Sequence, residues 1–227
     1  MLVELFTSEG CSSCPPADEL LARLDQQPIP GIHAIVLSEH VTYWDSLGWK
    51  DPFSLDAITQ RQQDYAARFH LQSVYTPQAV IGGQAQCVGT DARRLVEAIR
   101  EAAAQPRIPL TIDSARWNGK TVQFSISGPA APEANLYVAL ADETQQMHVQ
   151  HGENGGHTLH HVAVVRTLHN FGRLGGKGQA PFSTSLSLPL AAPDALTTAP
   201  IRLVVFLTDR KNGHVIGAVE QTLQRVL

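Results

Sequence analysis

Cysteine is scarce in this chain, which has only three cysteines, at positions 11, 14 and 87. So few thiols exclude a small scaffold held together by several disulfides. They also leave a closed zinc site incomplete, because such a site takes four nitrogen or sulfur ligands and a single CxxC motif supplies only two. Disulfide chemistry is therefore local to Cys11 and Cys14.

Long apolar runs and clustered basic residues are also absent. No stretch approaches the roughly 20 apolar residues that a membrane-spanning helix needs, so we expect no membrane span. The 17 Lys and Arg residues are scattered, and the formal net charge is -4. Because a nucleic-acid-binding surface needs clustered cations, we expect no nucleic-acid partner.

A charged segment followed by an apolar stretch, as found in signal peptides, is missing at the N-terminus. Residues 2–7 already read as a core strand. We expect a chain from which such a peptide was removed, and hence a periplasmic or secreted location, where disulfides persist.

The first half of the chain alternates between strand and helix patterns. Apolar runs at residues 2–7 and 32–41 predict buried strands, and helical spacing at 15–27, 54–70 and 91–104 predicts three helices. Between the last two, Gly82-Gly83 joins two short strands. The order βαβαββα is typical of an α/β sheet with helices on both faces.

The second half shows seven or eight short alternating runs separated by Gly, Pro, Asn and Asp. This spacing predicts an all-β sandwich. Two prolines at 106 and 109 break the preceding helix and mark a linker. We therefore predict two domains, residues 1–105 and residues 110–227.

Cys11 and Cys14 stand between the first predicted strand and the first predicted helix. Free amides and the dipole at a helix N-terminus favour a thiolate, which is the reacting species in disulfide exchange. We assign Cys11 as the nucleophile and Cys14, one turn later, as the resolving thiol. The alternative is a pair of inert thiols or half of a metal site, but the strand-to-helix position favours a redox pair.

Thr76-Pro77 precedes the next predicted strand, and proline adopts a cis peptide bond at modest cost. With the CxxC, this arrangement resembles the thioredoxin-like fold, in which a cis-proline faces the dithiol and the preceding residue offers its backbone to a peptide substrate. The resemblance implies that Pro77 is cis and that Thr76 lines a substrate site. An ordinary trans turn proline is the alternative.

An aromatic segment follows the second predicted strand, with Tyr43, Trp44, Trp49 and Phe53 close together. Such a loop serves as a lid or substrate platform near the dithiol, with Trp44 and Trp49 contacting substrate. It serves equally well as a cover for the edge of the sheet or as a surface that packs against the second domain. The sequence leaves both interpretations open.

Four segments in order, ELFTSEGCSSCPPAD, YWDSLGWKDPFS, TQRQQDYA and VYTPQ, resemble a bacterial family of secreted or periplasmic proteins of unknown function with a thioredoxin-like N-terminal domain. The segment GENGGHTLHHVAVVRTL extends the resemblance into the second half. There His161 and Arg166 fall on motif positions, whereas His157 and His160 depart from them. The resemblance implies the fold and export more than an activity.

Six of the ten histidines lie between residues 148 and 169. Imidazole binds zinc and copper, but His157 and His161 share one face of a predicted strand while His160 points to the other. Since the spacing yields no full ligand set, we expect structural or surface histidines, no metal and no cofactor. We expect Cys87 to be a small buried apolar residue.

The residues together predict thiol-disulfide exchange with a protein or small-thiol redox partner outside the cytoplasm. One alternative is a binding module whose two thiolates capture a soft metal such as Cu(I). A second is a non-catalytic interaction protein, because a fold does not determine a function. Ser12 and Ser13 add neither charge nor a ring, so the motif does not distinguish a reductase, an isomerase and an oxidase.

Overall fold

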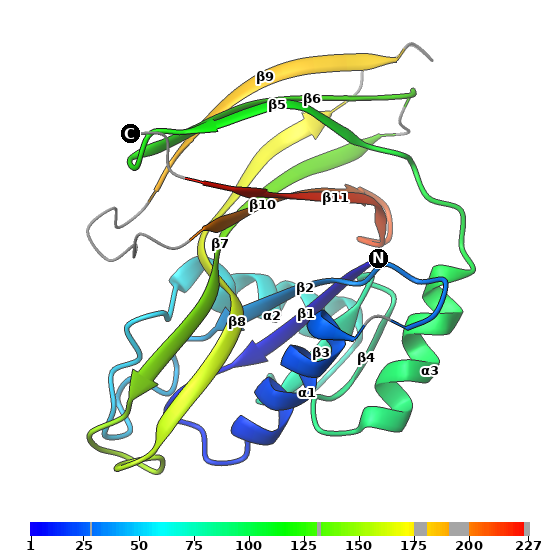
Figure 1. Ribbon diagram of the computed structural model, residues 1–227. Helices are drawn as coiled ribbons and strands as arrows, with labels where there is room; N and C mark the ends of the chain where they lie inside the picture. The colour runs from blue at the N-terminus through cyan, green and yellow to red at the C-terminus, as the bar shows by residue number, and fades with distance from the viewer. Residues whose placement is uncertain (28, 131–132, 175–180, 191–199, 225–227) are drawn as a thin grey trace. The chain divides into compact units, whose positions relative to one another are not determined.

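The computed structural model describes residues 1–27, 29–130, 133–174, 181–190 and 200–224 (Figure 1). In this part of the chain no helix has the length and apolar character needed to cross a membrane. The elements in chain order are β1 (Leu2–Thr7), α1 (Pro15–Gln26), β2 (Ile35–His40), α2 (Asp56–Arg68), β3 (Gln78–Ile81), β4 (Ala85–Val88), α3 (Ala92–Ala103), β5 (Thr111–Trp117), β6 (Thr121–Gly128), β7 (Ala134–His148), β8 (Thr158–Leu174), β9 (Phe182–Pro189), β10 (Ile201–Asp209) and β11 (Val215–Leu223).

The strands form one large mixed sheet and one small sheet. The large sheet has eight strands in the order β11-β10-β7-β8-β2-β1-β3-β4, and the small one has the order β5-β6-β9. The predicted fold class, an α/β thioredoxin-like βαβαββα domain followed by an all-β sandwich, is therefore wrong. The physical reason is strand pairing: β8 joins the free edge of β2 in parallel at Ser38 and Val164, and periodicity does not report such partners.

The chain divides into two compact units. Unit 1 comprises residues 1–105 and 144–165, and unit 2 comprises residues 106–143 and 166–227. The long strands β7 and β8 contribute residues to both units, so the hairpin between them belongs to unit 1 although it lies far beyond residue 105. Every residue of the candidate site below lies in unit 1.

In unit 1, β1 pairs in parallel with β2 and antiparallel with β3. Because side chains alternate along a strand, Val3 and Leu5 face one side and Glu4 and Phe6 face the other. Phe6 lies edge-on to Tyr65 of α2, with ring centroids 6.0 Å apart. Helices α1 and α3 lie over the opposite face (Figure 1). The apolar core on this face includes Val3, Leu5, Ala17, Leu21, Leu24, Val36, Ala79, Ile81, Leu95, Ala98 and Ile99.

The α2 face of the sheet also buries charges. Arg61 of α2 donates from Nε to Glu4 Oε1 at 2.5 Å, and the Tyr65 hydroxyl donates to the other Glu4 oxygen at 2.7 Å. Arg61 Nη2 donates in turn to the Tyr65 hydroxyl at 2.9 Å. Burial and then the nearby Glu4 raise the pKa of Glu39 on β2 well above its usual range, while the Arg61 cation opposes that rise.

Unit 2 has its own apolar core. β10 pairs antiparallel with both β7 and β11, and β6 pairs antiparallel with β5 and β9. Their alternating inward side chains form one cluster, which includes Trp117, Val122, Phe124, Ile126, Leu136, Val138, Leu140, Leu203, Val205 and Leu207.

Candidate functional site

Cys11 and Cys14 form a disulfide at the start of α1, with their Cα atoms 5.4 Å apart. Cys14 is the N-cap of α1, and two prolines fill the first helical positions, where a missing N–H costs no intrahelical bond. The backbone oxygen of Cys14 accepts from the amides of Ala17 and Asp18. Neither cysteine has exposed surface. The dithiol therefore lies where the sequence predicts it, but neighbouring residues bury both cysteines completely.

The segment from Ser8 to Cys14, here called the cysteine turn, is held by hydrogen bonds between residues two or three positions apart. The Cys11 amide donates to the Ser8 carbonyl at 3.2 Å, and the Cys14 amide donates to the Cys11 carbonyl at 3.1 Å. The Gly10 amide donates to Ser8 Oγ at 3.1 Å. These bonds lead the backbone directly from β1 into α1.

The loop between β7 and β8, residues 149–157, binds the cysteine turn. The backbone amide and the hydroxyl of Ser12 both donate to Glu153 Oε2, at 3.0 and 2.7 Å. Asn154 Nδ2 donates to the carbonyls of Glu9 and Cys11, at 2.8 and 3.0 Å. Sequence reasoning missed both contacts, because they join residues more than 140 positions apart.

The aromatic loop, residues 41–55, reaches the same region. Trp44 Nε1 donates to Thr76 Oγ1, and Trp49 Nε1 donates to Glu9 Oε2, each at 2.8 Å. The Thr76-Pro77 peptide bond is cis, as predicted. The structure thus brings Trp44 to Thr76 and Trp49 to the cysteine turn, while their role as substrate contacts, with that of Pro77, stays a prediction.

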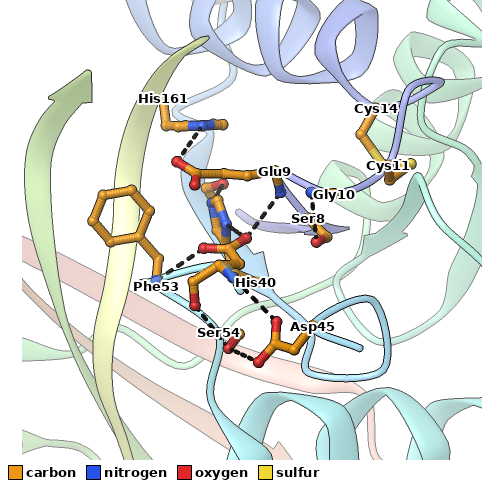
Figure 2. Close-up of polar contacts among 12 residues, drawn as sticks. Ser8, Glu9, Gly10, Cys11, Cys14, His40, Asp45, Phe53, Ser54 and His161 are labelled. Atoms are coloured by element: carbon orange, nitrogen blue, oxygen red, sulfur yellow. Dashed lines mark hydrogen bonds and ion pairs between the residues drawn. A yellow bond between two sulfur atoms is a disulfide. The ribbon is translucent and has the colours of Figure 1, made fainter. Parts of the chain in front are cut away.

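A buried charged cluster lies beside the cysteine turn. His161 Nε2 is 3.7 Å from Glu9 Oε1, and His161 Nδ1 is 3.7 Å from Asp18 Oδ2. Burial lowers the pKa of His161, but Asp18 and Glu9 outweigh it and raise the pKa to about 10. The ring is therefore a cation at neutral pH. In Figure 2 the Glu9 side chain points to His161 and away from the disulfide.

His40 continues this cluster on its other side. Its ring lies edge-on to that of His161, with centroids 4.8 Å apart. His40 Nδ1 pairs with Asp51 Oδ2 at 2.7 Å, and Nε2 lies 3.2 Å from Ser38 Oγ. Asp51 Oδ2 also accepts from the Glu9 amide at 2.8 Å. Burial raises the pKa of Asp51, but His40 and these bonds outweigh it and lower it.

Ser38, His40 and Asp51 thus repeat the hydrogen-bond order of a hydrolase triad. Each is no more than 1% exposed, and Ser38 lies within β2, between β1 and β8 in the large sheet, so the structure offers a substrate no path to its hydroxyl. We therefore assign the three residues a structural role, which is to fix the aromatic loop and the Glu9 backbone. The sequence signal was present but faint: Ser38 and His40 are two apart on one strand and so share a face.

The other histidines are not gathered into a site. Within the described ranges, no group of three or more His, Cys, Asp or Glu is arranged to hold a metal ion. His148 Nδ1 contacts Thr158 Oγ1 at 3.2 Å, and His169 packs edge-on against Phe171. Cys87 is a buried free thiol, as predicted, and burial followed by Asp91 raises its pKa to about 11.

Residues 2–208 match the family described as Protein of unknown function (DUF1223). The chain belongs to this family. The predicted membership of an uncharacterised family is confirmed at that level, and the family description assigns no activity. A comparison with curated proteins finds no match.

Solved structures resemble this DUF1223 member to very different extents. The crystal structure of protein AGR_C_4864 from Agrobacterium tumefaciens is 27% identical, with a TM-score of 0.70 over 96% of this chain and 92% of that one. The sporulation control protein Spo0M from Bacillus subtilis is 11% identical, with a TM-score of 0.35 over 53% and 49%. A beta-glucosidase from Kluyveromyces marxianus is 8% identical, with a TM-score of 0.24 over 53% and 14%. The last two likenesses are too remote to support an argument.

Gly89 tests how tightly this DUF1223 member packs beside the site. A Cβ atom added at Gly89 would lie 2.7 Å from Leu5 Cδ1, 3.0 Å from Ala17 Cβ and 3.1 Å from Pro77 Cβ. We expect Gly89→Ala to lower the free energy of unfolding by about 1–3 kcal/mol, because overpacking forces these neighbours apart. Urea unfolding measures the loss. The control Val88→Ala, at a half-exposed neighbour, is expected to change stability far less, and equal losses would contradict the packing argument.

Proposed function

We propose that the Cys11–Cys14 pair performs thiol-disulfide exchange with a protein or small-thiol partner, in a periplasmic or secreted setting. The observation that carries the proposal is the bonded pair at the N-terminus of α1, with Cys14 as the N-cap. The helix dipole at that end favours a thiolate on either sulfur, because it places partial positive charge at the start of α1. A pair that closes within one turn also lets Cys14 displace a partner bound to Cys11.

When the protein reduces its partner, the exchange takes two displacement steps. The Cys11 thiolate attacks one sulfur of the partner's disulfide, and the other partner sulfur leaves as a thiolate, giving a mixed disulfide. The Cys14 thiolate then attacks Cys11 Sγ and displaces the first partner sulfur, which re-forms the Cys11–Cys14 bond. Two electrons pass to the partner, and its two thiolates take up the protons released by the cysteines. The reverse sequence oxidises a partner dithiol.

The approach to the pair is proposed to be lined by Trp44, Trp49, Thr76 and Pro77. Trp44 bonds to Thr76, and its Cβ lies 3.3 Å from the position of a Cβ added at Gly10, so it sits directly beside the cysteine turn. Because both cysteines lack exposed surface, an incoming thiolate has to displace part of this cover. We therefore expect faster exchange with partners that first bind the residues lining this approach than with partners that do not.

The test is reduction of insulin, followed by turbidity, with a thiol reductant as the electron source. We expect the wild-type chain to catalyse the reaction and Cys11→Ser to lose all catalysis. Cys14→Ser should accumulate a mixed disulfide visible by intact mass, since it keeps the nucleophile and lacks the resolving thiol. The matched control is Cys87→Ser, which removes the third thiol and should leave the rate unchanged. Equal rates for wild type and Cys11→Ser, with a pair that resists reduction in the folded chain, would overturn the proposal.

A further inference from the structure

The side chain of Asn154 bridges two points on the cysteine turn. Its amide nitrogen donates to the carbonyl of Glu9 at 2.8 Å and to the carbonyl of Cys11 at 3.0 Å. Asn154 is 6% exposed, so these bonds form away from competing water. Both hydrogens of the amide are thus used on either side of Gly10.

Glu9, the first of these two points, is also held by two residues of the aromatic loop. The Glu9 amide donates to Asp51 Oδ2, and the Glu9 carboxylate accepts from Trp49 Nε1, each at 2.8 Å. In the described residues the other bonds of Cys11 stay within the cysteine turn: its amide donates to the Ser8 carbonyl, its carbonyl accepts from the Cys14 amide, and its sulfur lies 3.4 Å from Ser13 Oγ. Asn154 is the side chain from outside the turn that binds its backbone. Asn154 therefore spans the stretch between the anchored Glu9 and the first cysteine of the disulfide.

We propose that Asn154 is a positioning residue that holds the Cys11 backbone in the arrangement of the disulfide, favours the oxidised pair and so lowers its reduction potential. The inference rests on the exchange function proposed above. Reduction replaces a covalent bond with two thiols that need more room, so Cys11 shifts and its bond to Asn154 weakens. By linkage, an interaction that is stronger in the oxidised form must oppose reduction by the same free energy.

Glu153, which is bonded to Ser12, also lowers the reduction potential of the pair. Its carboxylate accepts from the Ser12 amide and hydroxyl, and these bonds lower the pKa of Glu153, so the group is ionised at neutral pH. A negative charge bound next to Cys11 disfavours a thiolate there and hence disfavours the reduced form. Its side chain is exposed, so its substitution tests the inference with little risk to the fold.

The experiment equilibrates the folded chain with reduced and oxidised dithiothreitol at fixed ratios and quantifies free Cys11 and Cys14 by alkylation and mass spectrometry. For Asn154→Ala we expect the ratio of reduced to oxidised protein to rise about tenfold, equal to a potential about 30 mV more positive. Asn154→Asp, which keeps the shape but replaces the donor with an acceptor, should shift it at least as far. Glu153→Gln should give a smaller rise, and His151→Ala, on the same loop, should give none.

The reduction potential of the Cys11–Cys14 pair distinguishes a positioning role of Asn154 from a general structural role. A residue that only supports the fold lowers the stability of both redox forms equally and leaves the ratio unchanged. An unchanged ratio in Asn154→Ala, or in Glu153→Gln should the Asn154 variants not fold, overturns the inference while insulin reduction still reports on the exchange function. A shifted ratio in a chain without insulin reductase activity supports Asn154 as a positioning residue and counts only against the exchange proposal.

Discussion

Replacing His161 with leucine is expected to lower the free energy of unfolding at pH 7 by about 3–5 kcal/mol. The substitution leaves the carboxylates of Glu9 and Asp18 in a buried site without the cation that lies 3.7 Å from each. An uncompensated buried charge costs far more than the apolar side chain recovers. Urea unfolding followed by circular dichroism gives the difference.

The loss should also depend on pH, with a defined sign. Asp18 and Glu9 overcome burial and raise the pKa of His161 from 6.5 to about 10. A raised pKa in the folded state contributes stability that is complete below pH 6.5 and is lost as the pH rises through about 10. Between these values wild-type stability should fall by up to about 1.4 kcal/mol per pH unit from this group, and the gap to His161→Leu should shrink.

His160→Leu is the matched control, because His160 is the exposed neighbour of His161 on β8. We expect it to change stability by less than about 0.5 kcal/mol at every pH. A His161→Leu variant as stable as this control, or a gap that stays constant from pH 7 to 10, would show that the ring is not the cation of the cluster.

The second large effect is expected at Arg61, on the α2 face of the sheet. Arg61→Met removes the donors to Glu4 Oε1 and to the Tyr65 hydroxyl, both buried. It leaves Glu4 charged, with no exposed surface, and so should cost about 3–5 kcal/mol of unfolding free energy. The two carboxyl groups Glu4 and Glu39 also interact unfavourably, and Arg61 is the cation that offsets them.

A double-mutant cycle makes this prediction specific. Changing Glu4→Leu together with Arg61→Met removes both charges, so the double variant should recover most of the loss of the single one. The exposed pair of Arg23 and Glu19 supplies the control, since Arg23→Met should cost less than about 1 kcal/mol. A double variant no more stable than Arg61→Met alone would argue against a charge effect.

Local sequence signals were reliable for the elements that carry the site. Cys14 followed by two prolines starts α1 as predicted, because proline suits the first helical turn. Asp91 caps α3 by accepting from the Arg94 amide, and Gly82-Gly83 turns the chain between β3 and β4. Each of these features depends on neighbours within a few residues, which is the range that composition and spacing report.

The sequence by itself thus determined where the dithiol lies, where the three helices and most of the strands lie, and that the chain resembles an uncharacterised family. Only the tertiary structure decided that β8 pairs with β2, which brings His161 to Glu9 and Asp18 and disproves the predicted sandwich. The structure alone also set Glu153 and Asn154 on the cysteine turn. The physical reason is that alternation tells which face of a strand is buried, whereas many strands satisfy that pattern equally and only packing selects the partner.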